Sequence, residues 1–403
     1  MTTRIKCNTS SAKSYLEKKA LMQLQKIEKG EIIWKNQSET KFGNPYINLR
    51  AEVIIHDNSF YNKFIWRGSL GAAESYMDGD WSCNNLTQLM QIIIENKSVL
   101  ANLEKGWSFA GHAFRTLKNI VSYSHIKKSK KNILYHYDLS NDFFKLFLDK
   151  KMLYSCAIFD DDLTDLDQAQ DRKLSQICER LQLTKDDHLL EIGSGWGALA
   201  IYAAQKYKCK VTTTTISDAQ YNYVYKKIND LGLKDRVFLE KKDYRQLDGK
   251  YDKLVSIEMI ESIGYQYFNK YFSICDNLLK PGGLFLLQSI TINDQEYDRY
   301  KREIDFIKAY IFPGGCLPCI ETISSAVKYK TSMRIKEIKD IGKDYAKTLC
   351  HWNSRFQKNL DKIIALGFDK KFTRMFEFYF CYCEAAFLSS YISDIHVVIE
   401  KKC

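Results

Sequence analysis

The stretch LLEIGSGWGALAIYAA, residues 189–204, constrains the fold more than any other part of the sequence. The apolar residues up to Glu191 have the length of a short buried strand, and the residues after Gly197 have the composition of an apolar helix. Gly193, Gly195 and Gly197 lie between them at two-residue intervals. Glycines are needed where a ligand approaches the backbone closely or where a loop adopts conformations closed to other residues. The stretch therefore predicts a strand, a ligand-binding loop and a helix of an α/β sheet.

Strand and helix patterns alternate between residues 132 and 401. We expect strands at 189–192, 210–215, 237–241, 253–257, 284–292, 333–341 and 396–400. Helical periodicity occurs at 199–207, 219–231 and 267–279, and a long helical tract covers 345–391. The pattern predicts a doubly wound, mostly parallel sheet of seven strands covered by helices. The last two strands could form an antiparallel hairpin at one edge.

Length and composition are those of a soluble globular protein. The chain has 403 residues, of which 45% are hydrophobic and 27% charged. This length suggests two domains, or one large domain with an appendage. The longest apolar stretches, such as GGLFLLQSITI, are shorter than the roughly 20 residues of a membrane-spanning helix. Because the first residues also lack the apolar core of a secretion signal, we expect a cytoplasmic protein.

The twelve cysteines are too sparse for a disulfide framework. Cys316 and Cys319 lie close together, but Pro318 separates them and no second pair has matching spacing. We therefore expect reduced thiols and no metal site.

Positive charge is concentrated in the first third of the chain. The net charge is +11, and residues 1–135 hold 20 basic and 11 acidic side chains, against 40 and 38 in residues 136–403. The run RTLKNIVSYSHIKKSKK, residues 115–131, has six lysines or arginines, one histidine, interleaved apolar residues and no acid. Such a run favours an anionic membrane surface. A solvated linker is the alternative, and no motif for nucleic-acid recognition accompanies the charge.

The glycine loop also indicates the class of its ligand. A dinucleotide-binding loop would have GxGxxG spacing and an acid at the end of the second strand. Here the spacing is GxGxG, an acid precedes it, and the second strand ends in TTTTIS. The loop resembles the S-adenosylmethionine site of class I methyltransferases, and a glycine turn without a ligand is the alternative. The segments YDKLVSIEMIESIG and KPGGLFLLQSITI resemble the fourth and fifth strands of the same sheet.

Four further segments narrow the resemblance to one family. They are YHYDLSNDFFKLFLDKKMLYSCAIF, DFIKAYIFPGGCLP, IGKDYAKTLCHW and ALGFDKKFTRMFEFYFCYCEAAF. Together they resemble the cyclopropane fatty acid synthase family over nearly all of residues 135–403. The segment WRGSLGAAESYMDGDWSC, residues 66–83, resembles the smaller domain of the phospholipid-acting members. The resemblance implies an N-terminal lipid-associated domain at 1–114, a basic linker at 115–134 and a methyltransferase domain at 135–403.

The resemblance also implies a reaction. Enzymes of this family transfer the methyl of S-adenosylmethionine to a cis double bond of a phospholipid acyl chain, and bound bicarbonate then removes a proton so that a ring closes. The resemblance implies that bicarbonate is bound by the backbone at Cys156 and Ile290 and by the side chains of Glu261 and Tyr345. This chain has Gln288 where the best-known bacterial members have a histidine. A glutamine amide can donate a hydrogen bond but cannot change charge near neutral pH.

The residues that the resemblance assigns to S-adenosylmethionine come from four segments of the chain. They are Tyr154, Ser155, Glu191, Gly193, Ser194, Gly195, Trp196, Gly197, Thr215, Ile216, Ser217, Gln220, Tyr244 and Arg245. Ordinary packing for Tyr154 and a surface charge for Arg245 are the alternatives. Cys383 matches a cysteine once suspected as a nucleophile in the family. Because the alkene attacks the methyl directly, the chemistry needs no thiolate, and Cys383 could simply be packed among aromatic residues.

Three other functions stay open at this point. The same active site could produce a methyl-branched or methylene acyl chain, the chain could be an amine N-methyltransferase, or it could bind lipid without catalysis. A small amine needs neither an N-terminal domain nor a basic segment. The expected partners are unsaturated phospholipids at the inner face of the membrane, with no nucleic acid, and the protein could form a homodimer.

Overall fold

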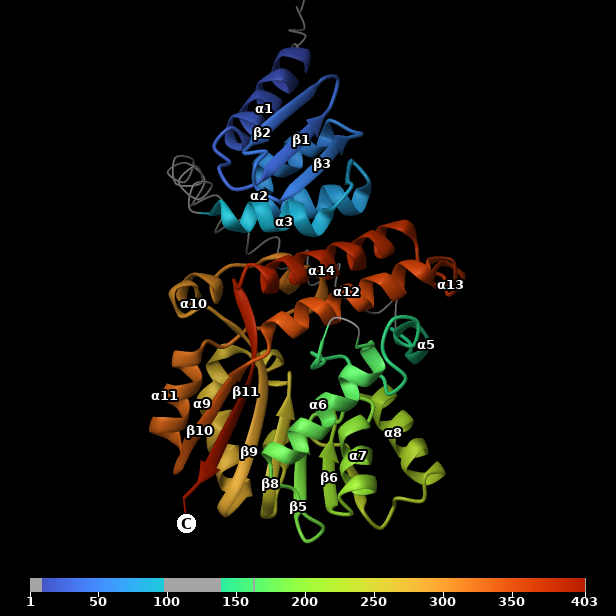
Figure 1. Cartoon of the computed structure of the whole chain (residues 1–403), viewed down its shortest axis with the longest axis vertical. Coiled ribbons are helices and arrows are strands. Elements are labelled where there is room, and N and C mark those ends of the chain that lie inside the picture. The colour runs from blue at the N-terminus through green and yellow to red at the C-terminus, as the bar shows by residue number, and fades with distance from the viewer. Residues whose placement is uncertain (1–8, 98–138, 162–163, 403) are drawn as a thin grey trace, which may run out of the picture. The chain divides into compact units, whose positions relative to one another are not determined.

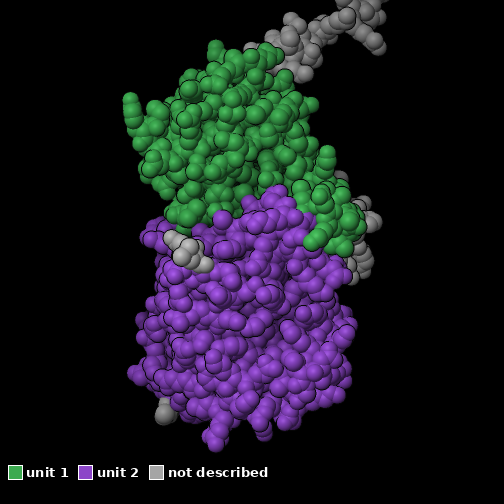
Figure 2. All heavy atoms as spheres, turned by 45° about the vertical axis from the view of Figure 1, so that its right-hand side comes forward, with its two compact units in different colours: residues 1–138, 305–311, 360–389 green, residues 139–304, 312–359, 390–403 purple. Residues whose placement is uncertain are grey.

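The computed structural model describes residues 9–97, 139–161 and 164–402, and the chain divides into two units (Figure 2). The first unit contains residues 1–138, 305–311 and 360–389, and the second contains residues 139–304, 312–359 and 390–403. The expected basic linker at 115–134 lies outside the described residues. Two segments from the C-terminal half thus belong to the same unit as the N-terminal residues.

The second unit is built on a seven-stranded sheet, as predicted. Its strand order is β10-β11-β9-β8-β5-β6-β7. Strands β5 to β9 are parallel, whereas β11 runs antiparallel to both of its neighbours, β9 and β10. The bounds are β5 His188–Ile192, β6 Lys210–Thr214, β7 Val237–Glu240, β8 Tyr251–Ile257, β9 Leu279–Ile292, β10 Met333–Asp340 and β11 Ile392–Lys401. The predicted terminal hairpin is confirmed.

Helices cover both faces of this sheet (Figure 1). Apolar side chains are buried between the helices and the sheet on each face. One core contains residues of α6, α7 and α8, such as Leu174, Ala203 and Val224; the other contains residues of α9 and α11, such as Phe272 and Ile323. The helices are α5 Asn141–Phe144, α6 Leu166–Arg180, α7 Ala198–Lys206, α8 Asp218–Asp230, α9 Phe268–Leu278, α10 Asp294–Tyr300, α11 Ile320–Lys330 and α12 Gly342–Lys358. Short 3-10 turns cover Tyr244–Gln246, Ile260–Ser262 and Tyr265–Tyr267.

Local capping explains where two of these helices begin. The side chain of Asp165 accepts a hydrogen bond from the Gln168 N–H at the start of α6, and Ser217 accepts one from the Gln220 N–H at the start of α8. Each bond satisfies a backbone donor that has no partner within the helix. The cap at Ser217 therefore fixes the turn after β6, which is one of the segments expected to bind the cofactor.

The first unit has a four-stranded sheet of order β2-β1-β3-β4. Its N-terminal elements are α1 Thr9–Leu24, β1 Glu31–Lys35, β2 Glu39–Gly43, β3 Arg50–Ile55, α2 Ser59–Asp78, β4 Trp81–Cys83 and α3 Leu86–Glu95. A π-helix, Ile307–Ile311, and helices α13 Leu360–Ala365 and α14 Lys370–Leu388 complete it. Most aromatic residues of α14, including Phe376 and Phe380, are buried. Among the described residues, no helix is long and apolar enough to span a bilayer.

Candidate active site

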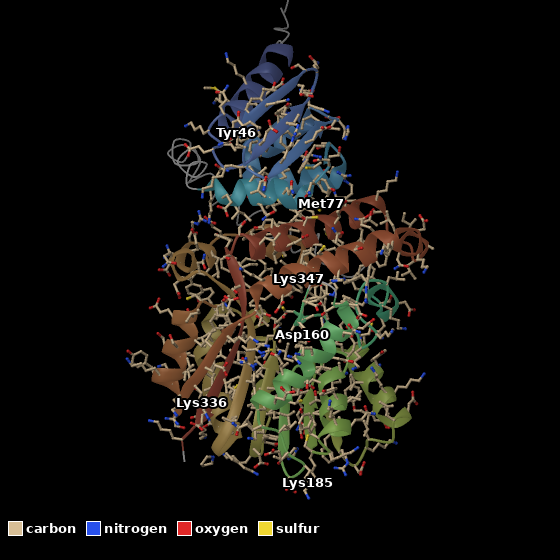
Figure 3. The ribbon with its side chains drawn as sticks, viewed as in Figure 1. Tyr46, Met77, Asp160, Lys185, Lys336 and Lys347 are labelled. Atoms are coloured by element: carbon tan, nitrogen blue, oxygen red, sulfur yellow. The ribbon has the colours of Figure 1, made fainter. Side chains whose placement is uncertain are left out.

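The candidate site lies at the carboxyl ends of β5 and β8, which are neighbours in the sheet. The chain leaves β5 toward α7 on one face and leaves β8 toward α9 on the other. Two such connections leave a crevice between them, where α/β sheets bind ligands. In Figure 3, Lys185 marks the edge where β5 begins, whereas Asp160 and Lys347 lie toward the opposite edge.

The glycine loop follows β5 and is buried or half-buried along its length. Gly193, Gly195 and Gly197 have φ values of +97°, +48° and +80°. The backbone N–H groups of Gly193 and Ser194 both donate to the carbonyl of Thr214, at 3.2 and 2.8 Å, and so anchor the loop to β6. A Cβ on Gly197 would lie 2.9 Å from Val224, whereas a Cβ on Gly195 would meet no atom within 4 Å. The middle glycine thus borders open space that a ligand can enter.

The other loop residues face inward and hold the loop in place. Glu191 is buried and accepts a hydrogen bond from the Thr213 hydroxyl at 2.5 Å. Burial raises the pKa of Glu191 to about 8, so its carboxyl is largely neutral at pH 7. The Ser194 hydroxyl donates to the carbonyl of Gly195 at 3.1 Å, and the Trp196 ring N–H donates to Asn141 at 2.8 Å.

The turn after β6 brings four of the expected cofactor residues together. The Thr215 hydroxyl donates to the side-chain carbonyl of Gln220 at 2.9 Å and accepts from the Ser217 N–H at 3.1 Å. Between them Ile216 is 74% exposed, which is unusual for an apolar side chain. The turn therefore presents one apolar side chain beside a pair of hydrogen-bonding groups.

Tyr244 and Arg245 differ in their surroundings. Tyr244 is buried and its ring packs at 5.5 Å from that of Tyr271. The Arg245 guanidinium makes two hydrogen bonds to Asp243, of 2.8 and 2.7 Å, and this ion pair lowers the pKa of Asp243. Arg245 therefore forms an ion pair with Asp243 in this structure.

Tyr154 and Ser155 precede the site in a well-packed segment. The Tyr154 ring lies 5.1 Å from Trp352 and 5.3 Å from Phe144, within an aromatic group that can exclude water. The Ser155 hydroxyl contacts the ammonium of Lys173 at 2.6 Å. Lys173 is fully buried, and burial lowers its pKa.

Sequence analysis missed Lys173, although a signal for it exists. The buried side chains of α6 include Leu166, Ala169, Lys173, Leu174 and Ile177, which recur at the three- and four-residue spacing of one helix face. A lysine within such an apolar stripe is a candidate buried charge.

Glu261 lies in the loop after β8 and reaches the end of β9. One oxygen of its carboxyl group, Oε1, accepts hydrogen bonds from the Ile290 N–H at 2.6 Å and from the Ser289 hydroxyl at 2.9 Å. The second oxygen, Oε2, is buried and has no hydrogen-bond partner among the described residues. Burial, together with the nearby charge of Glu258, raises the pKa of Glu261 to about 8. Glu261 and Ile290 are thus brought together as expected, but they bind each other.

Glu258 connects the remaining residues that were expected to hold an anion. Its Oε1 accepts hydrogen bonds from the backbone N–H of Cys156 and from the side-chain amide of Gln288, both at 2.8 Å. Its Oε2 accepts one from the Tyr345 hydroxyl at 2.7 Å. Sequence analysis did not single out Glu258, although SIEMIE places two acids three residues apart at the end of a strand.

Asp394 and His396 on β11 belong to the same cluster, because both contact the side chain of Gln288. Gln288 pairs with His396 across the β9–β11 ladder, and its amide also donates to Asp394 at 2.8 Å. The Gln288 side-chain oxygen lies 3.1 Å from His396 Nε2, so that nitrogen carries the proton. Burial lowers the pKa of His396 to about 3, which keeps the ring neutral at pH 7. The chain thus has a buried histidine beside Gln288, on a strand far away in the sequence.

Cys383 belongs to α14 in the first unit, so it is not among the residues that the second unit brings together. Burial raises the pKa of its thiol far above neutral pH. A neutral thiol is a poor nucleophile, which agrees with the expectation that the chemistry needs no thiolate.

Comparisons with known proteins agree with this geometry. The sequence profile of the mycolic acid cyclopropane synthetase family matches residues 124–397. The chain belongs to this family. Family membership, the glycine loop and the seven-stranded sheet together identify it as an S-adenosylmethionine-dependent methyltransferase.

Relatives of the chain in this family are named for different activities. The chain is 36% identical to the tuberculostearic acid methyltransferase UfaA1 of Mycobacterium tuberculosis, over 81% of this chain and 77% of the relative. It is 35% identical to the cyclopropane-fatty-acyl-phospholipid synthase of Escherichia coli, over 87% of this chain and 88% of the relative. The crystal structure of mycolic acid cyclopropane synthase CmaA1 complexed with SAH and CTAB is similar with a TM-score of 0.62 and 31% identity, over 67% of this chain and 97% of that chain.

Proposed function

We propose that this methyltransferase transfers the methyl of S-adenosylmethionine to a cis double bond of a phospholipid acyl chain and closes a cyclopropane ring. The observation that carries the proposal is the position of Glu258 and Glu261, two acids in the loop that borders the cofactor loop. A Cβ on Gly193 would lie 3.4 Å from Met259, which lies between these acids in the sequence. An acidic cluster beside a methyl-donor loop suits a reaction in which a cation forms and a proton leaves.

The residues of the loop fit S-adenosylmethionine, which supplies a methyl group on a sulfonium when bound. The space over Gly195 can admit the ligand, and the exposed Ile216 offers an apolar surface for a flat aromatic ring. The buried side chains of Glu191 and Trp196 make hydrogen bonds that hold the loop in shape. These residues would bind and orient the donor.

The acyl chain needs different surroundings, because an alkene is a poor nucleophile. Its π electrons form a bond to the methyl carbon while the bond from that carbon to sulfur breaks. A C–H bond of the transferred methyl then breaks, its electrons close the ring, and a proton leaves. The aromatic group around Tyr154 and Trp352 can exclude water and stabilise the positive charge that forms between these steps.

The resemblance implied bicarbonate as the acceptor of that proton, but the described residues do not fit such an ion in this arrangement. Of its expected ligands, Cys156, Gln288 and Tyr345 donate to Glu258, and the N–H of Ile290 donates to Glu261. The donors that would bind a second anion are therefore already in use.

A methyl-branched or methylene product is the second candidate. It is supported by the tuberculostearic acid methyltransferase among the most similar relatives. Both candidates share the methyl transfer and differ only in the fate of the cation that it forms. An amine substrate finds less support, because the relatives at 35–36% identity are named for fatty acyl products.

A product assay tests the proposal. Purified protein is incubated with labelled S-adenosylmethionine and vesicles of unsaturated phosphatidylglycerol, and the acyl chains are analysed by mass spectrometry and proton NMR. We expect label in the lipid and the upfield proton signals of a cyclopropane ring. Vesicles of saturated lipid are the control and should acquire no label. Label in a vinylidene or methyl signal would support the second candidate, and no lipid label would contradict both.

A further inference from the structure

We propose that the carboxylate of Glu258 is the proton acceptor of this enzyme, in the place where the family resemblance implies a bicarbonate ion. The inference rests on the proposed function, because it concerns the proton that leaves when the ring closes. The hydrogen-bond donors that were expected to surround a bound bicarbonate ion surround the carboxylate of Glu258 instead.

The carboxylate of Glu258 has the hydrogen-bond donors that a protein provides for a bound anion. The backbone N–H of Cys156 and the amide of Gln288 both donate to Oε1 at 2.8 Å, and the Tyr345 hydroxyl donates to Oε2 at 2.7 Å. A carboxylate and a bicarbonate share the same planar group of one carbon and two oxygens, so the same donors can hold either. The glutamate is covalently fixed and needs no binding step.

Glu258 as a residue is more exposed than the residues that hold its carboxylate. Cys156, Gln288 and Asp394 are buried, whereas Glu258 is only partly buried. The groups that hold the carboxylate are thus inside the protein, and Glu258 precedes Met259, which lies 3.4 Å from the position of a Cβ on Gly193 in the glycine loop.

The surrounding charges favour the ionised form of Glu258 over that of its neighbour. The carboxyl groups of Glu258 and Asp394 share a hydrogen bond. Burial raises the pKa of both, but that of Asp394 lies well above its usual range because Glu258 and Glu261 face it. Glu258 has hydrogen bonds from Cys156 and Tyr345 and the charge of Lys173 in its favour. Asp394 therefore holds a proton more readily than Glu258, and Glu258 is the member of the pair better placed to act as a base.

The backbone of Glu258 indicates that this position is held at some cost. Its φ is +46°, in the left-handed region that favours glycine. Strain of this kind persists only where the surrounding structure compensates it, and it is common in active sites. Here the compensation is the set of hydrogen bonds to the carboxylate.

The step balances without any other reactant. The C–H bond of the transferred methyl breaks, its electron pair closes the ring, and the proton moves to Glu258, which becomes a neutral acid. The Tyr345 hydroxyl can rotate from donating to accepting and so stabilise the protonated form. Exchange of the proton with solvent restores the carboxylate after the product leaves.

Two variants and one change of buffer test the inference. In Glu258→Gln an amide fills the site and cannot accept the proton. Glu258→Gly relieves the backbone conformation and vacates the space between the three donors. Each protein is assayed for lipid product and for S-adenosylmethionine affinity by calorimetry, in buffer depleted of bicarbonate and in buffer with added bicarbonate or formate. Asp298→Asn, an exposed acid outside the site, is the matched control.

We expect the parent and Asp298→Asn to work equally well without bicarbonate. Product formation by Glu258→Gln should fall about 100-fold or more in either buffer, the range for loss of a general base, while S-adenosylmethionine affinity changes little. Glu258→Gly should be equally slow in depleted buffer and recover at least tenfold with bicarbonate or formate. Added bicarbonate should raise the melting temperature of Glu258→Gly alone, a readout that does not depend on turnover.

The outcomes separate the inference from the proposed function. A parent that loses activity when bicarbonate is removed, or a Glu258→Gln variant that keeps the parental rate, would overturn the role of Glu258 and leave the methyl transfer intact. A parent with no lipid-dependent turnover in any buffer would overturn the proposed function, and the inference with it.

Discussion

At the scale of single residues, Gly195 makes the sharpest prediction about the cofactor. Its φ is +48° and its missing side chain leaves open space. Gly195→Val should therefore lower the affinity for S-adenosylmethionine by at least about 100-fold, because a branched side chain would occupy that space and disfavour the turn. Calorimetry with S-adenosylmethionine measures the effect.

Gly232 provides a matched control for backbone strain. It has φ +65° and its Cβ would also meet nothing within 4 Å, but it lies at the end of α8, away from the loop. Gly232→Val should lose similar stability and keep its affinity for S-adenosylmethionine. Equal affinity in both variants, with both folded, would contradict the position of the cofactor over Gly195.

Glu191 makes a prediction about the pH dependence of stability. Its pKa is raised to about 8 in the folded protein, from a usual value of 4.5. The folded state thus binds the extra proton between these values, and the parent loses stability as the pH rises through this window. Glu191→Gln does not titrate and its amide oxygen can still accept from Thr213. The variant should gain about 1.4 kcal/mol of unfolding free energy over the parent for each pH unit between about 5 and 8.

Urea unfolding at pH 5, 6.5 and 8 checks this difference. The exposed Asp186→Asn serves as the control and should run parallel to the parent. If Glu191→Gln also runs parallel to the parent, the buried carboxyl is ionised in the folded state and the pKa assignment is wrong.

At the scale of elements, the periodic pattern located the strands of the second unit and helices α7, α8 and α9 within a few residues, but it did not predict α6 or α11. It located the strands because each buried strand is a short apolar run bounded by turn residues. The long helical tract at 345–391 was only partly right: the structure divides it into α12, α13 and α14, with Gly367 at φ +98° before α14. Membership of α14 in the first unit depends on packing against distant elements, which no local pattern records.

The site shows the same division between local and distant information. The glycine loop is one continuous segment with its own spacing, so the sequence is enough to predict it. The cluster around Glu258 combines β8, β9, β11 and α12, and its members meet only because β11 pairs with β9 in one register. Asp394 and His396 are two residues apart and face one side of β11, but nothing near them in the sequence indicates Gln288 as their partner.

Arg374 connects helix α14 to α2 and β4 within the first unit. The Arg374 guanidinium donates to the backbone carbonyls of Tyr76 at 2.5 Å and Trp81 at 2.7 Å and lies 4.0 Å from the Tyr76 ring centroid. Arg374→Met should lose about 1–3 kcal/mol of local stability, because the carbonyls of Tyr76 and Trp81 each lose a charged donor. Hydrogen exchange should show the loss in α14, α2 and β4 but not in α7 of the second unit.

The control for Arg374 lies one turn away. Lys371 pairs with Asp78 at 2.6 Å on the surface, and exposed pairs of this kind contribute about 0–1 kcal/mol. Lys371→Met should therefore change hydrogen exchange little. If the two variants behave alike, or if α7 loosens as much as α14, Arg374 does not fasten α14 to its own unit.

At the scale of the whole molecule, the distribution of charge matters more than its sum. Residues 1–135 account for nine of the eleven net positive charges, since they hold 20 basic and 11 acidic side chains. A uniformly basic surface would bind any polyanion weakly, whereas a local basic segment is a feature of proteins that dock on anionic membranes. The substrate proposed for this enzyme lies in such a membrane.

The basic run at residues 115–131 should therefore drive docking. Replacing Lys127, Lys128, Lys130 and Lys131 with glutamine should weaken binding to anionic vesicles by up to about 1 kcal/mol per charge and reduce its dependence on salt. Co-sedimentation at several salt concentrations measures both effects. The control replaces four exposed lysines of the second unit: Lys185, Lys226, Lys234 and Lys343. Both variants have a net charge of 11 − 4 = +7, so equal loss of binding in the two would show that total charge, and not this segment, attracts the membrane.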